Sequence, residues 1–508
     1  MLRPIDDFLN KVTMYQLTLW GLRLLAVISI ALSLTGALPL PTTGLLLSAV
    51  LLAVSSHVSN KILSRIWRAP ANNESYAITL LILFFILPPV TSVSEGAFTA
   101  VAGVLAMASK YLLAYNAKHL FNPAAFAVVV LGVLGVLQAT WWVGSAALWP
   151  LVLVLGLLIL RKIRRFELFV AFAAVALSVL VLTAVTDGDS VADTIRFAIT
   201  SSPLIFLGTI MLTEPATMPG RRRQQIIFGA LVGLLYALPW NIGPLTLYPE
   251  TALVIGNLYA FAVNPRYRLR LRLKEIQKVS DRVYNYVFTP DRKADFRPGQ
   301  YMEWTLPHDK IDSRGNRRTF SIASSPTEPE IHLGVKYYTP PSSFKRALAA
   351  MQPGDEIMAG QIAGDFTLPS DAGQKLLIVA AGIGITPYRS MLKYATDTKA
   401  KRDMVLIYAV SDSAEVAYKD VLADAETHGI RAILLLTSGT SPAKSTSSGW
   451  KGLIGTLNSD FIEQQVPDYK DRVVYLSGPN TTVDNVRSGL LQSGMSRKRI
   501  KTDYFPGY

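Results

Sequence analysis

The first 264 residues of this chain consist largely of apolar runs, several of which approach the length needed to cross a membrane. About 20 predominantly apolar residues span the roughly 30 Å of hydrocarbon in a bilayer. The runs lie at residues 16–37, 43–58, 76–93, 98–115, 124–139, 145–160, 166–186, 194–213, 224–240 and 251–264. We therefore expect a multi-domain chain whose residues 1–264 form a polytopic α-helical membrane domain of about ten spans. Because several runs are short, we expect some spans to be broken or tilted.

The distribution of charge agrees with a membrane domain. The 508 residues carry a formal net charge of +14 although only 17% of them are charged. Within the apolar half, Lys and Arg fall in the second, fourth, sixth and eighth connections between runs and are missing from the odd ones. Cytoplasmic loops carry such an excess, so we expect a multi-pass protein of the cell (inner) membrane with both termini in the cytoplasm. We therefore attribute the basic excess to membrane-flanking charge and expect no nucleic acid partner.

Two proline-containing motifs interrupt the apolar runs. Asn122-Pro123 opens the fifth run, where proline is tolerated because its missing N–H would be unpaired in the first helical turn. Asn122 is accordingly predicted to be an N-cap. Thr213-Glu214-Pro215 closes the eighth run, and an ionisable residue such as Glu214 at a membrane boundary is often functional.

These motifs carry a resemblance over residues 10–264. Phe121-Asn122-Pro123-Ala124-Ala125 and the segment from Ser201-Ser202-Pro203 to Thr213-Glu214-Pro215-Ala216-Thr217 resemble the family that contains the B subunit of the sodium-pumping NADH:quinone oxidoreductase and the D subunit of the Rnf complex. Members carry FMN covalently on a Ser-Gly-Ala-Thr segment, which is missing from this sequence. The resemblance therefore implies a flavin held without a covalent bond, FMN or riboflavin, between the fifth and eighth spans, with Asn122 and Thr213 at its site.

The second half has the pattern of two soluble domains. Short β-like runs broken by prolines predict an antiparallel β-barrel over residues 265–370. A continuous apolar strand at 375–381 then leads into a glycine-rich turn, and further strands are expected at 404–410, 431–437 and 472–476. Strands that alternate with helices indicate an α/β domain with a parallel sheet over residues 371–508, which binds ligands at the carboxyl ends of its strands.

Five motifs follow one another in this half, and their order resembles the ferredoxin–NADP reductase superfamily. They are Arg318-Thr319-Phe320-Ser321, Ser342-Ser343, the segment from Gly360 to Phe366, Gly382-x-Gly384-x-Thr386-Pro387, and Ser477-Gly478-Pro479 with the C-terminal Asp503-Tyr504-Phe505. The resemblance implies an FAD-binding domain followed by a domain that binds NADH or NADPH. It also implies that a nicotinamide stacks on the flavin ring for hydride transfer.

The same resemblance assigns roles to individual residues. The Arg318-Thr319-Phe320-Ser321 motif is expected to bind FAD, with Arg318 on the pyrophosphate, Phe320 beside the isoalloxazine and Ser321 near its N5. The resemblance implies that Ser342 and Ser343 help to bind the pyrophosphate, and either Phe505 or Tyr508 is expected to shield the flavin face. The expected nicotinamide-nucleotide site comprises Gly382, Gly384, Thr386, Pro387 and Gly478. The expected catalytic residues are Ser321, Ser477 and Asp503.

The sequence also bears on the choice of nucleotide. Asp412 follows the strand 404–410 at a position where NADPH-specific relatives commonly have an arginine, and its charge repels a 2′-phosphate. Tyr418-Lys419 points the other way, because similar residues help to bind that phosphate in NADPH enzymes. We expect NADH to be preferred.

The expected function is that of a membrane-bound flavoprotein oxidoreductase. Electrons would pass from cytoplasmic NAD(P)H through FAD to a membrane flavin or quinone, or across the membrane to an extracytoplasmic acceptor. A redox-driven ion pump or transporter is an open alternative. A haem-type ferric reductase is another, although two stacked haems need four histidines. The chain has five histidines and no cysteine, and only His57 and His119 lie in the apolar half. No metal site is predicted.

Overall fold

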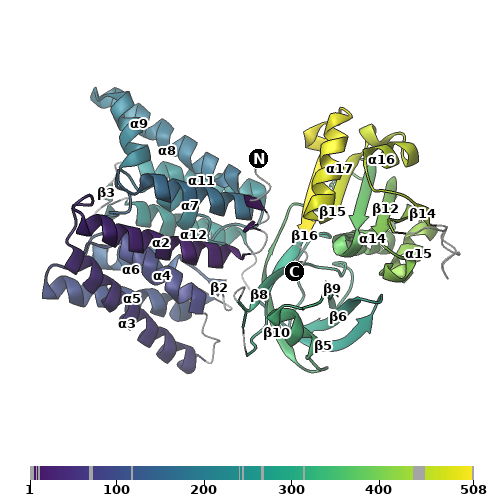
Figure 1. The fold of residues 1–508 in the computed structure, drawn as a ribbon, viewed down its shortest axis with the longest axis horizontal. Helices are drawn as coiled ribbons and strands as arrows, with labels where there is room; N and C mark the ends of the chain where they lie inside the picture. Colours follow the sequence, from purple (N-terminus) through teal and green to yellow (C-terminus); the bar gives the residue numbers. More distant parts are fainter. Residues whose placement is uncertain are drawn as a thin grey trace. The chain divides into compact units, whose positions relative to one another are not determined.

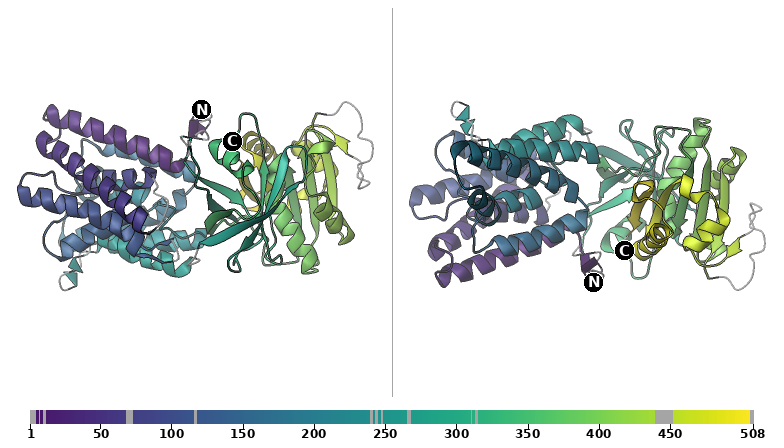
Figure 2. Two further views of the ribbon diagram at one scale, coloured as in Figure 1. Left: turned by 90° about the horizontal axis from the view of Figure 1, so that it is seen from below. Right: turned by 90° about the horizontal axis from the view of Figure 1, so that it is seen from above.

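The computed structural model describes residues 5–6, 8–9, 12–67, 73–115, 118–238, 241–242, 245–246, 248–264, 268–309, 311–312, 315–438 and 452–505. The chain divides into two compact units, Met1–Arg268 and Leu269–Tyr508. The first unit is helical, and the second contains two six-stranded sheets with helices (Figure 1). Figure 2 gives two further views of the same elements.

The helical unit has an apolar core to which nearly all of its helices contribute. Its helices are α2 (Met14–Leu34), α3 (Thr42–Ile66), α4 (Asn73–Ile86), α5 (Val93–Leu112), α6 (Pro123–Val133), α7 (Trp149–Ile163), α8 (Phe166–Asp187), α9 (Val191–Thr200), α10 (Leu204–Phe206), η1 (Leu207–Met211), α11 (Arg222–Ala237) and α12 (Pro249–Val263). Two short hairpins pair β1 (Ala114–Tyr115) with β2 (Lys118–His119) and β3 (Asn241–Ile242) with β4 (Leu245–Thr246). Many apolar side chains on α2, α3 and α8 are exposed, which is typical of helices that face lipid.

The number of membrane-spanning helices differs from the prediction. Among the described residues, α2, α3 and α8 are long and apolar enough to cross a membrane, and the bent pair Val191–Thr200 with Leu204–Met211 makes a fourth if it counts as one span. The expected count of ten spans is therefore wrong, although the apolar runs do form helices. Two of the shorter apolar helices, α4 and α6, contain 14 and 11 residues. At 1.5 Å per residue they reach about 21 and 17 Å, short of a hydrocarbon layer of roughly 30 Å.

One segment of the helical unit departs from α-helical geometry. α9 and the helix that follows it are bent by 54° relative to one another. The five residues of η1, Leu207–Met211, form a buried π-helical turn. Such turns occur frequently at functional sites because they change the direction of the side chains that follow. Here the turn leads directly into Thr213 and Glu214.

The first sheet of the second unit is an antiparallel half-barrel with strand order β8-β7-β10-β5-β6-β9. β5 (Leu269–Lys278) shows how the sequence produces it. Leu269, Leu271 and Leu273 are buried while Arg270 and Arg272 between them are exposed, as the two-residue period of a strand requires. The remaining elements are β6 (Val283–Pro290), β7 (Tyr301–Thr305), β8 (Arg317–Ser321), β9 (Ile331–Lys336), α13 (Ser343–Ala349) and β10 (Glu356–Ala363).

The second sheet is parallel and is covered by helices on both faces. Its order is β14-β13-β12-β11-β15-β16, formed by β11 (Leu376–Ala381), β12 (Met404–Val410), β13 (Arg431–Leu436), β14 (Leu453–Ile454), β15 (Val473–Pro479) and β16 (Ile500–Phe505). Every residue of β11 is buried. Alternate side chains of this strand enter one core with α14 (Thr386–Asp397) and α15 (Lys419–Thr427), or another with α16 (Ser459–Gln465) and α17 (Asn480–Gln492).

The strand order defines where a ligand can bind. From β11 the chain adds β12, β13 and β14 on one side, and it then returns to add β15 and β16 on the other side of β11. The order thus reverses between β11 and β15. Ligands of open parallel sheets bind at the carboxyl ends of the strands at such a reversal. The expected succession of an antiparallel domain and a parallel α/β domain is confirmed as the fold of this unit.

Candidate functional site

The flavin motif lies on edge strand β8 of the half-barrel. Arg318 and Phe320 are two residues apart and share one face of the strand, where both approach the ring of Phe344. The Arg318 guanidinium carbon lies 5.4 Å from that ring centre, and the Phe320 ring lies 5.9 Å from it. Thr319 is exposed and Ser321 is buried on the opposite face. Phe344 belongs to α13, so this helix and β8 meet through the two predicted flavin-binding residues.

The residues expected to bind the pyrophosphate converge on one carboxylate. An Arg318 Nη donates to an Asp312 oxygen at 3.2 Å, and the backbone N–H of Ser343 donates to the other oxygen at 2.9 Å. The Ser343 hydroxyl in turn accepts a hydrogen bond from the Asp312 N–H at 3.0 Å and lies 3.1 Å from His308 Nε2. The side chain of Ser342 caps α13 by accepting from the Lys345 N–H. Because a guanidinium and an amide already bind an anionic group here, the donor set fits a phosphate.

The glycine-rich turn begins where β11 ends. Gly382 has a φ of +55°, a left-handed conformation that glycine adopts without strain, and a Cβ there would meet open space. At Gly384 a Cβ would lie 2.3 Å from the Ser477 carbonyl oxygen, so a side chain here would clash with β15. This glycine therefore allows the turn to approach β15. The buried Thr386 uses its hydroxyl to cap the turn by donating to the Ile383 carbonyl, and Pro387 lies in the first turn of α14.

The expected catalytic residues Ser477 and Asp503 are neighbours on β15 and β16. Their Cα atoms are register partners, and Gly478 and Pro479 pair with Tyr504 and Phe505 in the same way. Ser477 is 2% exposed, and its hydroxyl has no hydrogen-bond partner among the described residues. A buried polar group without a partner is costly, so its presence at the carboxyl end of a strand fits a ligand that supplies the partner.

The charge of Asp503 affects the pKa of Tyr388, a tyrosine in the core of the parallel domain. Burial raises the pKa of the Tyr388 hydroxyl, and the negative charge of Asp503 raises it further. Tyr388 lies on α14 and donates to the Val379 carbonyl of β11 at 3.2 Å. The Asp503 carboxylate therefore lies within electrostatic reach of α14, the helix that follows the glycine-rich turn.

The residues relevant to nucleotide choice lie after β12. Asp412 accepts the Ala414 N–H at 2.8 Å and so caps the short turn that follows the strand. Tyr418 is only 4% exposed, and its hydroxyl would be 2.2 Å from a Cβ on Gly334. The Tyr418 hydroxyl is thus packed against the half-barrel strand β9, and it has no hydrogen-bond partner among the described residues.

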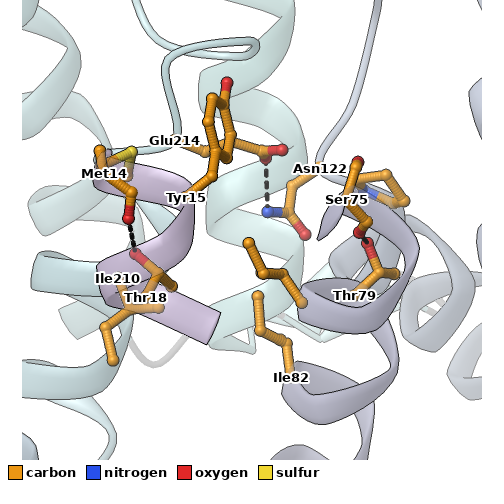
Figure 3. A pocket seen from close by; sticks show the side chains of 11 residues that line it. Met14, Tyr15, Thr18, Ser75, Thr79, Ile82, Asn122, Ile210 and Glu214 are labelled. Atoms are coloured by element: carbon orange, nitrogen blue, oxygen red, sulfur yellow. Dashed lines mark hydrogen bonds between the residues drawn. The ribbon is translucent and has the colours of Figure 1, made fainter. Parts of the chain in front are cut away.

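The helical unit contains a pocket at the two proline motifs (Figure 3). The space within it, about 440 Å³, includes volume that is open to solvent. It is lined by Met14, Tyr15, Thr18, Ser75, Ile78, Thr79, Ile82, Asn122, Pro123, Ile210 and Glu214. Residues near the N-terminal ends of α2, α4 and α6 all contribute to the lining, which brings three helix starts to one region.

Asn122 organises one wall of this pocket. Its side-chain oxygen accepts the Ala125 N–H at 3.1 Å, which confirms the predicted N-cap. Its side-chain amide donates to Glu214 at 2.8 Å, as Figure 3 shows, and its backbone N–H donates to Asn257 on α12 at 2.8 Å. Glu214 also accepts from the Thr217 hydroxyl at 3.2 Å.

Thr213 does not occupy the expected position. It is fully buried, its hydroxyl donates to the Thr209 carbonyl at 2.7 Å, and it is not among the lining residues. Glu214, which follows the π-turn η1, lines the pocket instead. Sequence reasoning also missed Tyr15, Ser75 and Thr79, which belong to ordinary apolar helices and carry no recognisable motif.

No group of three or more His, Asp or Glu side chains within the described ranges is arranged to hold a metal ion. His57 and His119, the only histidines of the helical unit, lie on α3 and β2 respectively.

Comparison with known proteins identifies the second unit more closely. Residues 378–488 match the family model of the oxidoreductase NAD-binding domain. The glycine betaine monooxygenase reductase subunit of Chromohalobacter salexigens is 25% identical over 247 residues, which cover 48% of this chain and 65% of that protein. The ferredoxin reductase component of a 3-ketosteroid-9-alpha-monooxygenase from Rhodococcus rhodochrous is 28% identical over 222 residues, covering 42% of this chain and 58% of the other.

One solved structure with bound cofactors is also similar. A ferredoxin NADP+ reductase from Neisseria gonorrhoeae with FAD and NADP aligns with 47% of this chain and 98% of its own, at 19% identity and a TM-score of 0.40. The reductase resemblance is confirmed for the C-terminal region by the family match, and with it oxidoreductase chemistry with FAD and a nicotinamide nucleotide as cofactors. The resemblance of residues 10–264 to the sodium-pump and Rnf subunits rests on its sequence motifs alone.

Proposed function

We propose that this chain is a membrane-bound oxidoreductase that passes electrons from cytoplasmic NADH or NADPH through FAD to a redox group held in the helical unit. The observation that carries the proposal is that one chain contains both halves of such a system. The second unit has the reductase fold and the family match, and the first has apolar helices around a polar pocket. We further propose a multi-pass arrangement with both termini in the cytoplasm.

In the reductase unit, we assign a role to each residue from its position in the structure. Arg318 and the amide of Ser343 bind the FAD pyrophosphate, and Ser321 lies at the end of the same strand as Arg318. When bound, FAD accepts a hydride from the nicotinamide and releases the two electrons singly. Ser477 offers its unsatisfied hydroxyl to the nicotinamide nucleotide, and Asp503 beside it supplies a carboxylate at the same edge.

In the helical unit, we propose that the pocket holds FMN or riboflavin without a covalent bond, or a quinone. Three helix N-termini and the side chains of Tyr15, Ser75 and Asn122 provide groups for ring carbonyls. Irregular backbone at membrane depth is tolerated where it lines a cavity, as the π-turn before Glu214 does. From this group electrons would continue to a quinone or to an extracytoplasmic acceptor.

Flavin analysis of the purified full chain tests this proposal. We expect FAD together with a second flavin released by acid, or FAD with NADH-dependent quinone reduction. Arg318→Ala should remove FAD and leave the second flavin in place, which assigns each flavin to its site. A preparation that binds no FAD and does not oxidise NADH or NADPH would contradict the reductase half. FAD alone, without reduction of any quinone or extracytoplasmic acceptor, would contradict the membrane half.

Coupled ion movement is the second candidate, because the helical unit contains one carboxylate that lines the pocket and another that is buried. Glu214 lines the pocket, and the buried Glu250 accepts from the Trp141 indole at 2.8 Å. Carboxylates inside a membrane domain often mark ion pathways. NADH-dependent uptake of Na⁺ or H⁺ into proteoliposomes, lost in a Glu214→Gln variant that still oxidises NADH, would establish this function.

A further inference from the structure

A short segment connects the flavin strand β8 to β9 and is fixed to the half-barrel at its beginning. The N–H of Ile322 donates to the Gln300 carbonyl at 2.9 Å, and the N–H of Ala323 donates to the His332 carbonyl at 3.0 Å. The Ser324 hydroxyl accepts the His332 N–H at 3.1 Å. These bonds begin immediately after Ser321, so the backbone of residues 322–324 is held against the half-barrel.

The same segment is also held by helix α14 of the parallel domain. Arg389 on α14 is 6% exposed and binds the Glu328 carboxylate with both terminal nitrogens, one of them at 2.8 Å. It donates in addition to the Ala323 carbonyl at 3.2 Å. The next residue, Ser390, donates to the Ser324 carbonyl at 2.6 Å.

Glu328 is paired with the positive charge of Arg389 and not with that of the nearby His332. Burial lowers the pKa of His332 to about 4, and the positive charge of Arg389 contributes in the same direction. The imidazole is therefore neutral at physiological pH. The Glu328 carboxylate also accepts the Ser325 N–H at 2.6 Å. This bond holds the carboxylate against the backbone of the same segment.

The location of this ion pair links the two cofactor sites. Ala323 lies two residues after Ser321, whereas Arg389 lies one helical turn after Thr386 and the glycine-rich turn. We propose that Arg389 is a positioning residue which, through Glu328 and Ala323, sets the position of the flavin edge at Ser321 relative to the nicotinamide bound at the start of α14. This inference rests on the proposed reductase function and adds a residue to it that no sequence motif singled out.

The physical reason is the sensitivity of hydride transfer to distance. The reacting atoms must lie about 3–3.5 Å apart, and a displacement of about 1 Å costs roughly a hundredfold in rate. Arginine can bind the two Glu328 oxygens and the Ala323 carbonyl at once because its guanidinium is a planar fork with several donors. Lysine keeps the charge but loses this geometry. Arg389→Lys should therefore slow hydride transfer without emptying either cofactor site.

The test compares Arg389→Lys and Glu328→Gln with Lys393→Gln in the full chain. Lys393 lies on the same helix and pairs with Asp397, whose carboxylate also accepts the Thr327 hydroxyl of the segment. This variant therefore tests whether the loss of any positive charge beside the segment has the same effect as the loss of the Arg389 fork. In Arg389→Lys we expect the rate of flavin reduction at saturating NADH to fall by about tenfold to a hundredfold. FAD content and the Kd for NAD+ should stay within about twofold of wild type, and the long-wavelength charge-transfer absorbance between nicotinamide and flavin should weaken.

A readout that does not depend on turnover accompanies these measurements. Hydrogen–deuterium exchange of peptides that cover residues 322–328 should become faster in Arg389→Lys and Glu328→Gln, while exchange in β11 and β12 stays unchanged. If Arg389→Lys reduces flavin as fast as Lys393→Gln, or if FAD content and nucleotide affinity fall in parallel with the rate, the positioning role is wrong. If Arg389→Lys does not fold, Glu328→Gln decides by the same criteria. A wild-type protein without FAD or NADH oxidation would instead refute the proposed function itself.

Discussion

The side-chain amide of Asn122 donates a 2.8 Å hydrogen bond to the carboxylate of Glu214, which lies 92 positions further along the chain. The two residues belong to the two proline motifs that interrupt the apolar runs, and they meet on one wall of the pocket. Both motifs end or begin helices, so each places polar groups among the apolar helices of this unit. The contact explains why two distant helix breaks occur in the same unit.

Arg318→Ala should deprive the protein of FAD. The guanidinium is the charged donor of the anion site formed with the amide of Ser343, and a hydrogen bond to a charged group contributes about 1.5–3 kcal/mol. We expect the Kd for FAD to rise by about tenfold to a hundredfold, measured by flavin fluorescence on the deflavinated protein. Arg346→Ala on α13 is the control. Arg346 is exposed, and its guanidinium donates to the Pro341 carbonyl and not to Asp312. Full FAD occupancy of Arg318→Ala would show that the anion site is not the pyrophosphate site.

Asp312→Asn should have the opposite effect on FAD. The Asp312 carboxylate binds the same two donors that we assign to the pyrophosphate, so it competes with the phosphates and repels them. Asparagine keeps a carbonyl oxygen for the donors but removes the negative charge. We expect about fivefold tighter FAD binding, corresponding to about 1 kcal/mol. Weaker binding would mean that Asp312 orients Arg318 for FAD.

Asp412→Arg should shift the nucleotide preference towards NADPH. The wild-type carboxylate lies after β12 and repels a 2′-phosphate, and Tyr418, the residue that pointed towards NADPH, is buried. We expect wild type to favour NADH and the variant to gain about tenfold in its ratio of kcat/KM for NADPH to that for NADH, because one charge-assisted bond is worth about 1.5 kcal/mol or more. A wild-type kcat/KM that favours NADPH tenfold would contradict this assignment.

How far the sequence predicts the structure depends on how local the determining interactions are. Strand β12 coincides with the predicted 404–410, because a continuous apolar run between polar turns is determined by its own residues. The pairing of Ser477 with Asp503 was not predicted, because β16 is a separate strand that the sequence did not indicate. The direction of Thr213 was not predictable, because it depends on a π-turn that no residue type marks. The Arg389–Glu328 pair was missed for a related reason, since it joins two elements 61 residues apart and belongs to no local pattern.

Gly233→Ala should destabilise the helical unit. α8 and α11 pack closely, and a Cβ on Gly233 would lie 2.4 Å from the Phe172 carbonyl oxygen, which is backbone and cannot rotate away. Separating the helices to relieve this contact opens gaps along both, so we expect a loss of about 1–3 kcal/mol and a lower Tm. Gly132→Ala on α6 is the control, because its Cβ would meet nothing within 4 Å. Equal Tm values for the two variants in detergent would contradict close α8–α11 packing.

Asn122→Ala should release the redox group of the helical unit while leaving FAD in place. The substitution removes the N-cap of α6 and the bond to Glu214, both of which shape the pocket wall. We expect acid-extracted flavin from the full chain to lose the FMN or riboflavin fraction and to retain FAD. If the pocket holds a quinone, the KM for the quinone should rise by about tenfold, as expected for a lost buried hydrogen bond of about 1–1.5 kcal/mol.

Thr213→Val is the matched control for this variant. Thr213 is adjacent to Glu214 in the chain, but its hydroxyl bonds back to the Thr209 carbonyl and does not line the pocket. Its replacement by a side chain of similar size should therefore preserve both the second flavin and acceptor reduction, with at most a small loss of stability. If Thr213→Val removes the redox group as effectively as Asn122→Ala, the redox site includes Thr213 and is not confined to this pocket. If neither variant changes flavin content or acceptor reduction, the pocket is not a redox site, and the helical unit must receive electrons elsewhere.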